Sequence, residues 1–143
     1  MNWTISRLDS GDLSDLMELA SQLGYPNQAG DLSERLNFLN SLNNHLIIKI
    51  SENKKTMGWI HLEKVYDLIE ETKVEIKAIV VNENYRSRGY GKYLIAHAKK
   101  WAREEGISTI YLNCNIVRER THEFYKREGF ALVKTSLFFE LEL

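Results

Sequence analysis

The chain of 143 residues and 16.7 kDa has the size of one domain, and its 43% hydrophobic and 27% charged residues are typical of a globular protein. Its net charge of −1 lacks the surplus of cations that a sequence-independent nucleic-acid binder needs, and no apolar run is long enough to span a bilayer. The single cysteine, Cys114, excludes an intrachain disulfide, and residues 1–7 contain no apolar signal-peptide core. We therefore expect one cytoplasmic domain over residues 1–143 that binds neither nucleic acid nor a membrane.

The first half of the chain is expected to form a strand, two helices and three further strands. Apolar residues recur at helical spacing from Leu13 to Leu23, and Gly24 with Pro26 behind it ends that helix. Three later segments rich in β-branched residues are separated by short polar turns, which suggests an antiparallel meander. The segments predicted to form the six elements are, in order, 3–8, 13–23, 32–42, 45–51, 56–65 and 72–81.

The second half is expected to alternate helices and strands. The hydrophobic period becomes helical after Gly89, and Gly106 ends that helix. The order of elements predicts an α+β fold with a mixed, mostly antiparallel sheet, because an antiparallel half is followed by a β-α-β crossover. The predicted segments are a helix at 89–105, a strand at 109–113, a helix at 117–128, and strands at 130–133 and 136–143.

The segment over residues 80–92, which joins a predicted strand to a predicted helix, is the most informative one. Gly89 and Gly91 let a ligand approach the backbone closely, and the first N–H groups of the following helix lack helical partners and attract anions. Three basic side chains flank the glycines: Arg86, Arg88 and Lys92. Together these features favour a phosphate or pyrophosphate ligand over a simple exit from a strand.

Two common phosphate-binding loops do not fit this segment. A Walker A loop needs glycine and Ser or Thr where Arg86 and Tyr93 stand, and a dinucleotide-binding fingerprint needs a small residue in place of Leu94. Another signature fits better. The stretch Arg86-Ser87-Arg88-Gly89-Tyr90-Gly91 resembles the Arg/Gln-x-x-Gly-x-Gly/Ala signature of the GNAT family of N-acetyltransferases. Phe124-Tyr125 with Gly129-Phe130 is similar to the Phe-Tyr-x-x-x-Gly-Phe ending of that family, and the order of elements also fits.

The resemblance implies that acetyl-coenzyme A is the cosubstrate and that the glycine loop holds its pyrophosphate. By this likeness the backbone donors come from Arg88, Gly89, Tyr90, Gly91 and Lys92, with Arg86 and Ser87 at the entry of the loop. The pantetheine arm is implied to lie along the strand end Ile79-Val80-Val81, whose backbone would hydrogen-bond it as if adding a strand.

The resemblance also implies direct transfer of the acetyl group to an amine. Tyr125 matches the general-acid tyrosine of the family, whereas without that match it reads as the aromatic partner of Phe124. Glu75 aligns with a glutamate base of one branch, and the period of a strand is expected to place residues 75, 77, 79 and 81 on one face. Glu75 is equally well read as a solvated partner of Lys73 or Lys77. The alternatives left open for the base are Glu70, Glu71, His61 and a chain of water molecules.

The remaining polar residues are expected to have structural uses. His45 and His61 have no acidic or cysteine partners at metal-ligand spacing, so no metal is predicted. Cys114 is expected to be a buried, unreactive thiol, and the role of Arg118 is open. The terminal strand at 136–143 is expected to be exposed and able to pair across a homodimer.

We therefore predict an acetyl-CoA-dependent N-acetyltransferase that acts on a primary amine of a small molecule, a peptide or a protein. The alternative is a catalytically silent module that binds acyl-CoA for regulation or sensing. The presence of Tyr125 favours the enzyme.

Overall fold

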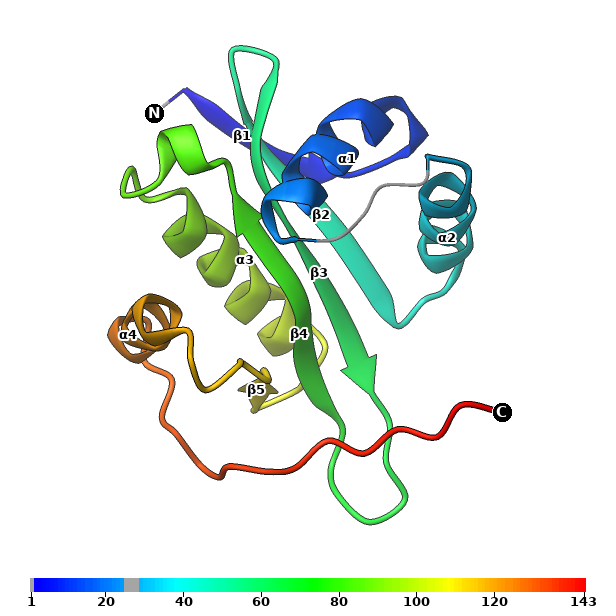
Figure 1. Cartoon of the computed structure of the whole chain (residues 1–143), viewed down its shortest axis with the longest axis vertical. Coiled ribbons are helices and arrows are strands. Elements are labelled where there is room, and N and C mark those ends of the chain that lie inside the picture. Colours follow the sequence, from blue (N-terminus) through cyan, green and yellow to red (C-terminus); the bar gives the residue numbers. More distant parts are fainter. Residues whose placement is uncertain (1, 25–28) are drawn as a thin grey trace. The chain divides into compact units, whose positions relative to one another are not determined.

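The computed structural model describes residues 2–24 and 29–143, so the expected helix stop at Pro26 lies outside the described residues. Contacts between residues divide the chain into two compact units, Met1–Asn113 and Cys114–Leu143. In chain order the elements are β1 (Trp3–Arg7), α1 (Leu13–Gln22), α2 (Ala29–Ser41), β2 (His45–Glu52), β3 (Lys55–Val65), β4 (Lys73–Val81), α3 (Tyr90–Glu104), β5 (Ile110–Tyr111) and α4 (Glu119–Arg127), with short 3₁₀ turns at Ser10–Asp12 and Glu83–Tyr85 (Figure 1).

The strands of the first unit form one mixed sheet in the order β1-β2-β3-β4-β5. Strands β1 to β4 pair as antiparallel neighbours, whereas β5 runs parallel to β4 and pairs with it only through Val74–Ile110 and Glu75–Tyr111. A parallel pair needs a crossover, which α3 supplies here. The predicted α+β fold with a mostly antiparallel sheet is confirmed.

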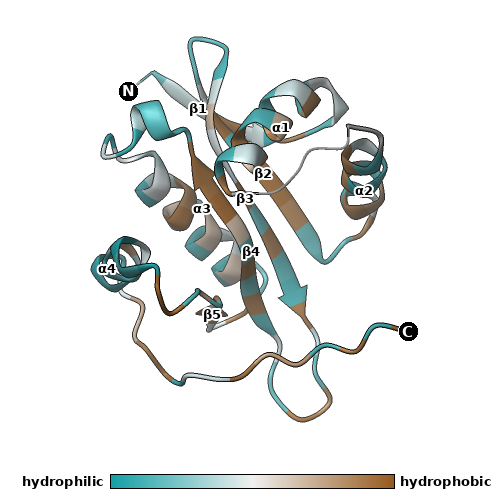
Figure 2. Ribbon diagram, viewed as in Figure 1, coloured by the Kyte–Doolittle hydropathy of each residue, from teal (hydrophilic) through white to brown (hydrophobic). Residues whose placement is uncertain are grey.

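The two faces of the sheet are covered by different helices. On one face, α1 and α2 bury Leu16 and Leu36 in a cluster with Ile47, Trp59 and Val80 of the strands. Helix α3 lies on the opposite face and buries its own apolar stripe, which consists of Tyr90, Leu94, Ile95, Ala98 and Ala102 (Figure 1). Figure 2 shows the apolar residues gathered along β2, β3 and β4, between these helices. The core therefore fixes both the strand before the glycine loop and the helix after it.

The C-terminal region differs from the prediction. Helix α4 forms within the expected range, but the expected strands at 130–133 and 136–143 are absent, and their residues have no regular secondary structure. The physical reason is that a strand is defined by a hydrogen-bonded neighbour, and within the described residues none pairs with this segment. The expected strand at 109–113 is shortened to Ile110–Tyr111 because only two of its residues pair with β4.

Candidate functional site

The loop from β4 to α3 is anchored at its base by Asn82, whose side chain is only 3% exposed. The backbone N–H of Asn82 donates to the carbonyl oxygen of Met57 on β3 at 2.7 Å. Its side-chain Oδ1 accepts from the backbone N–H of Asn84 at 3.1 Å and thereby caps the 3₁₀ turn that follows. The backbone N–H of Glu83 donates to Oε1 of Gln22 at the end of α1, at 2.9 Å. The loop is thus attached to the sheet and to a helix on one face of it.

Two residues of the loop adopt the left-handed backbone region. Gly89, which immediately precedes α3, has φ +89°, and Ser87 has φ +67°. A Cβ atom added at Gly89 would meet only the ring of Tyr93, at 3.5 Å, so glycine is required there by the backbone conformation rather than by lack of space. Positive φ is rare for a serine, and such strained residues cluster at functional sites.

The first turn of α3 presents free donors beside positive charge. Its first helical hydrogen bond runs from the N–H of Tyr93 to the carbonyl of Gly89, at 3.0 Å. No side chain among the described residues caps this helix start, so the earlier N–H groups remain available. The basic side chains that flank the glycines, Arg86, Arg88 and Lys92, are all exposed. This geometry suits an anion.

A fourth cation reaches the loop from the hairpin between β2 and β3. The Lys55 Nζ lies 4.9 Å from the centre of the Tyr85 ring and 3.3 Å from its hydroxyl, while the guanidinium of Arg88 lies 5.2 Å from the same ring centre. Sequence reasoning missed Lys55, because it lies thirty residues before Tyr85 and carries no local signal. Tyr85 thus holds two cations on the loop.

The side chain of Tyr90 is buried at the start of α3. Its side chain is 5% exposed, and its hydroxyl donates to Oε2 of Glu52 at the end of β2, at 2.6 Å. This hydrogen bond to the carboxylate raises the pKa of Tyr90. Only the backbone of Tyr90 is therefore free to contact a ligand, and its side chain fixes the start of α3 to the sheet.

Strand β4 contains a bulge that corrects the expected arrangement of its side chains. Ala78 pairs with His61 and Ile76 pairs with Leu62, so Lys77 is an extra residue in the ladder. Ala78 and Val80 consequently pack on the α1–α2 face, the same face as Glu75 and Lys77. The expectation that residues 79 and 81 share the face of Glu75 was wrong, because the bulge shifts the two-residue period by one position.

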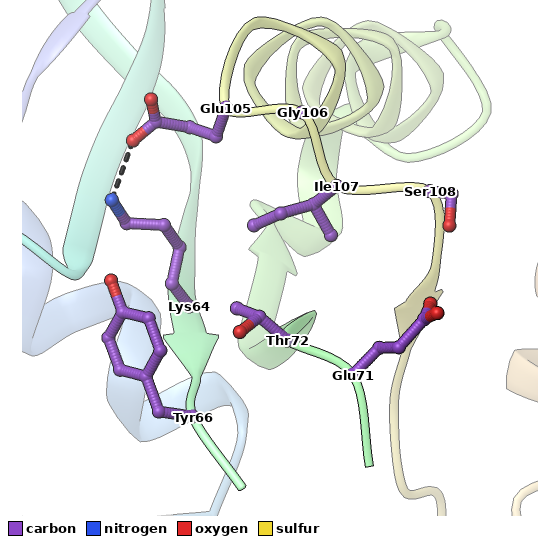
Figure 3. A pocket seen from close by; sticks show the side chains of 8 residues that line it. All are labelled: Lys64, Tyr66, Glu71, Thr72, Glu105, Gly106, Ile107 and Ser108. Atoms are coloured by element: carbon purple, nitrogen blue, oxygen red, sulfur yellow. Dashed lines mark hydrogen bonds and ion pairs between the residues drawn. The ribbon is translucent and has the colours of Figure 1, made fainter.

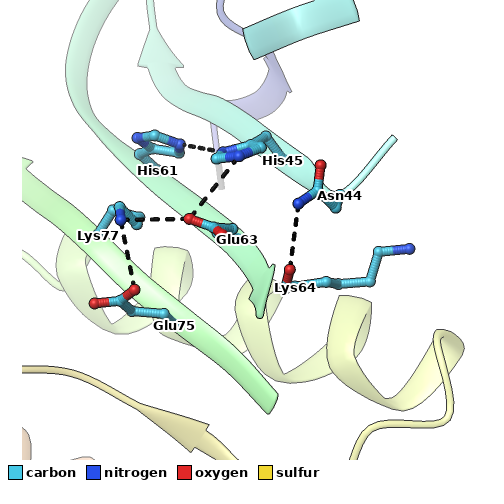
Figure 4. A network of polar contacts seen from close by, with 7 residues as sticks. All are labelled: Asn44, His45, His61, Glu63, Lys64, Glu75 and Lys77. Atoms are coloured by element: carbon cyan, nitrogen blue, oxygen red, sulfur yellow. Dashed lines mark hydrogen bonds and ion pairs between the residues drawn. The ribbon is translucent and has the colours of Figure 1, made fainter. Parts of the chain in front are cut away.

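Glu75 belongs to a polar network that crosses three strands (Figure 4). Lys77 Nζ lies 3.5 Å from Oε1 of Glu75 and 3.3 Å from Oε1 of Glu63, which is 3.9 Å from Nε2 of His45. The Nδ1 atom of His45 is in turn 2.9 Å from Nε2 of His61. The contact confirms the interpretation of Glu75 as a partner of Lys77. Glu63 also belongs to the network, and sequence reasoning missed it.

The network shifts the protonation of its members. Burial lowers the pKa of His61 to about 4, with further lowering by His45 and Lys77, so His61 is neutral at physiological pH. Burial alone would lower the pKa of Lys77, but the carboxylates of Glu75 and Glu63 raise it instead. Burial, with the charges of Glu75 and Glu63, raises the pKa of Tyr111 on β5.

The other sites considered for a base lie apart from this network. Glu70 contacts Lys73, with 3.4 Å between Oε2 and Nζ. Glu71 borders a hollow of about 470 Å³ (Figure 3), which lies near the start of β4, whereas the glycine loop follows the end of that strand (Figure 1). Across this hollow Lys64 Nζ lies 2.6 Å from Oε1 of Glu105. Apart from Glu71, the hollow is lined by none of the residues considered for the site.

The second compact unit contains Tyr125 on α4. Its ring makes edge contacts with Phe124, at 5.3 Å, and with Phe130, at 5.6 Å between ring centres. Burial raises the pKa of Tyr125 to about 12, so the phenol keeps its proton throughout the neutral range. The aromatic packing expected for Tyr125 is present, and its protonated state is the one that a hydrogen donor needs.

The second unit also contains Cys114, the single cysteine of the sequence, and His122. Cys114 is exposed, so the expectation of a buried thiol was wrong, although partial desolvation raises its pKa. The Nε2 atom of His122 lies 2.8 Å from the carbonyl oxygen of Asn115, a structural contact.

The described residues contain neither a metal site nor a membrane-spanning helix. No group of three or more His, Cys, Asp or Glu side chains in that part of the chain could hold a metal ion. None of the helices found there is long and apolar enough to cross a bilayer.

Comparison with known proteins assigns the chain to a family. The sequence model of the acetyltransferase (GNAT) family matches residues 13–130, which include the glycine loop and the Phe-Tyr pair. The chain belongs to this family. The resemblance of the two motifs is therefore confirmed at the level of the family.

Two curated relatives of this GNAT chain match over shorter stretches. The aminoalkylphosphonate N-acetyltransferase of Salmonella typhimurium is 34% identical over 79 residues, which are 54% of this chain and 51% of that protein. The uncharacterized N-acetyltransferase YhdJ of Bacillus subtilis is 36% identical over 58 residues, 40% of this chain and 41% of that protein. The chain thus spans about half of the length of these relatives or less.

Solved structures share the fold over nearly the whole GNAT chain. A GNAT family acetyltransferase of Staphylococcus aureus has a TM-score of 0.82 at 21% identity and covers 99% of this chain and 100% of its own. The aminoglycoside N-acetyltransferase AAC(6')-Iy, solved with a bisubstrate analogue of CoA and acetylneamine, has a TM-score of 0.89 at 15% identity, with 100% of both chains covered. Because the sequence identities are this low, the structural similarity establishes the fold alone.

Proposed function

We propose that this chain is an acetyl-CoA-dependent N-acetyltransferase whose acceptor is a primary amine of a small molecule, a peptide or a protein. The observation that carries the proposal is the start of α3, where uncapped N–H groups follow the left-handed Gly89 and four cations, Lys55 among them, lie nearby. The residues present therefore fit a pyrophosphate. Further support comes from AAC(6')-Iy, which has been solved with CoA.

The residues proposed to hold acetyl-CoA come from the loop and from β4. The backbone of Arg88, Gly89, Tyr90, Gly91 and Lys92 donates to the pyrophosphate, and the side chains of Arg86 and Ser87 flank it. Strand β5 pairs with β4 only at Val74 and Glu75, so within the described residues the outer edge of β4 beyond them has no strand neighbour. The backbone of Ile79, Val80 and Val81 on that edge is proposed to bind the pantetheine arm.

Two side chains are proposed to move protons. When bound, acetyl-CoA supplies an acetyl group that is activated as a thioester. Glu75 accepts a proton from the acceptor's ammonium, because its carboxylate lies 3.5 Å from Lys77 Nζ and is partly open to solvent. Tyr125 holds a proton on its hydroxyl for the leaving thiolate, which its raised pKa permits at neutral pH. We also propose that both compact units act as one domain, supported by the family match across residues 13–130.

The binding part of the proposal is tested by calorimetry with acetyl-CoA. Gly91→Glu brings bulk and negative charge to the first turn of α3, so the Kd should rise at least about tenfold, or ~1.4 kcal/mol. Ala96→Glu adds the same charge to an exposed position on the same helix and is the matched control. Equal affinity of both variants and the unmutated protein would contradict the loop assignment.

The catalytic part is tested by thiol release with a panel of amines. Tyr125→Phe should lower kcat by roughly 10²–10⁴-fold, as for loss of a general acid, while Tyr66→Phe, at an exposed tyrosine, should not. Glu75→Gln should lower kcat more than Glu71→Gln. Tight binding of acetyl-CoA without turnover on any amine would favour the alternative of a silent binding module.

A further inference from the structure

Four polar residues form a row across the sheet, one on each of four neighbouring strands. The register pairs Glu63 of β3 with Glu75 of β4, and the row continues to His45 of β2 on one side and to Tyr111 of β5 on the other. Because directly paired residues point to the same face, these side chains share the face on which α1 and α2 pack. All four are half-buried, so a ligand can still reach them.

Glu63 and Glu75 place two carboxylates directly opposite each other in this row. Like charges in that position are destabilising, because the Cβ atoms of directly paired residues are only ~4.5–5.5 Å apart. One lysine serves both carboxylates: Lys77 Nζ lies 3.3 Å from Oε1 of Glu63 and 3.5 Å from Oε1 of Glu75 (Figure 4). A second cation bound at this pair would relieve the repulsion that remains.

The contact with Lys77 also indicates which kind of cation the pair takes. Lys77 carries a primary ammonium, and the two carboxylates already hold that group between them. An ionised carboxylate has about four lone-pair sites, and within the described residues Glu75 is ion-paired only with Lys77 and Glu63 only with Lys77 and His45. The side chains of Glu63 and Glu75 are 21% and 19% exposed. Both therefore have capacity left for a ligand that carries ammonium groups.

The proposed function brings the acceptor to this row. Glu75 is proposed to take the proton of the reacting ammonium, so the acceptor nitrogen must come within hydrogen-bond reach of its carboxylate. Glu63 lies beside it on the same face, at a distance on the order of 5 Å between paired side chains. The second nitrogen of a short aliphatic diamine can span that distance and reach Glu63 while the first lies at Glu75.

We infer that Glu63 is a specificity-determining residue, which selects acceptors that carry a second ammonium group, as short aliphatic diamines do. The inference rests on the proposed function, because it uses Glu75 as the base. A second ammonium forms a charge-assisted hydrogen bond with Glu63, whereas an uncharged end gains nothing and an anionic end is repelled by both carboxylates. Among acceptors of equal length, the expected order is therefore diamine, monoamine and amino acid.

The test compares putrescine, butylamine and γ-aminobutyrate, which have equal chain length. Rates are measured by thiol release with saturating acetyl-CoA, and affinities by calorimetry in the presence of CoA. In the unmutated protein kcat/KM and affinity for putrescine should exceed those for butylamine by at least about tenfold, with γ-aminobutyrate the poorest. Glu63→Gln should bring putrescine and butylamine to within about threefold of each other.

The matched control is Glu104→Gln, which removes the same charge from an exposed position on α3, on the opposite face of the sheet. This variant should keep the preference for putrescine, so a general effect of net charge is separated from recognition by Glu63. Tryptophan fluorescence reports on folding of the first unit in each variant, since Trp3, Trp59 and Trp101 all lie there.

The two readouts separate this inference from the proposed function. Equal affinity and equal kcat/KM for putrescine and butylamine in the unmutated protein overturn the role of Glu63 and leave acetyl transfer intact. A preference that survives Glu63→Gln overturns it as well, because another group then recognises the second ammonium. Tighter binding of putrescine that depends on Glu63, without acetylation of any amine, supports the role of Glu63 and contradicts the proposed transfer.

Discussion

The depressed pKa of His61 makes the stability of the sheet depend on pH. In the folded chain this imidazole titrates at about 4, because it is buried and lies beside His45 and Lys77, whereas in the unfolded chain it titrates near 6.5. Between these values the unfolded chain binds more protons at this position than the folded chain, so the free energy of unfolding falls as the pH is lowered. Above about pH 6.5 the imidazole is neutral in both states, so its titration no longer changes the free energy of unfolding.

The magnitude follows from the size of the shift. One pKa unit corresponds to about 1.4 kcal/mol, so a shift from 6.5 to about 4 corresponds to roughly 3 kcal/mol once the pH is below both values. His61 is half-buried and partly screened by solvent, which reduces the expected loss to about 2 kcal/mol. Roughly half of that loss should appear between pH 7 and pH 5.

The assay is urea unfolding followed by tryptophan fluorescence at several pH values, with His61→Gln compared with the unmutated protein. The variant lacks the titrating group, so its free energy of unfolding should fall less steeply between pH 6.5 and pH 4. His45→Gln should retain most of the slope, because burial is the larger cause of the shift and the charge of His45 the smaller one. Equal slopes in His61→Gln and the unmutated protein would refute the reasoning.

Three further substitutions test packing around the loop, each by urea unfolding. Gly58→Ala should destabilise the fold by about 1–3 kcal/mol, because the new Cβ would lie 2.5 Å from the carbonyl oxygen of Val80 and force β3 and β4 apart; an unchanged midpoint would contradict this close contact. Leu94→Ala should lower the free energy of unfolding by about 2–5 kcal/mol, because the leucine is 0% exposed beneath the sheet. A loss below about 1 kcal/mol would mean that neighbouring side chains move in and fill the cavity. Tyr90→Phe should lower the free energy of unfolding by about 1–2 kcal/mol, because the hydrogen bond to Glu52 is lost. An unchanged free energy of unfolding would indicate that water replaces the hydroxyl.

Local patterns in the sequence predicted most of the first unit. Helices α1 and α3 have clear helical periods, and β1 to β4 lie between recognisable turns, so their existence and pairing order were predictable. The start of α2 was placed at Leu32 instead of Ala29. The bulge at Lys77 was missed because an extra residue in a ladder depends on its partner strand, and no residue of β4 marks it.

Contacts between distant residues account for what was missed at the site. Lys55 and Glu52 reach the loop from the hairpin between β2 and β3, and only the fold brings them to Tyr85 and Tyr90. The terminal segment illustrates the reverse case. Its apolar residues favour a strand, but a strand also requires a neighbour, and the described chain does not provide one.

The attachment of Tyr90 to Glu52 has a consequence for the entropy of ligand binding. Because the first turn of α3 is fixed to the sheet by a buried ring and a hydrogen bond, its N–H groups are already ordered before a ligand arrives. Arg86 and Lys92 are exposed and must lose rotamer freedom on binding, at about 0.5–1.5 kcal/mol for each side chain. The rigid backbone can therefore contribute more net affinity than the two charged side chains, and loosening the helix start would reduce affinity without removing a single direct contact.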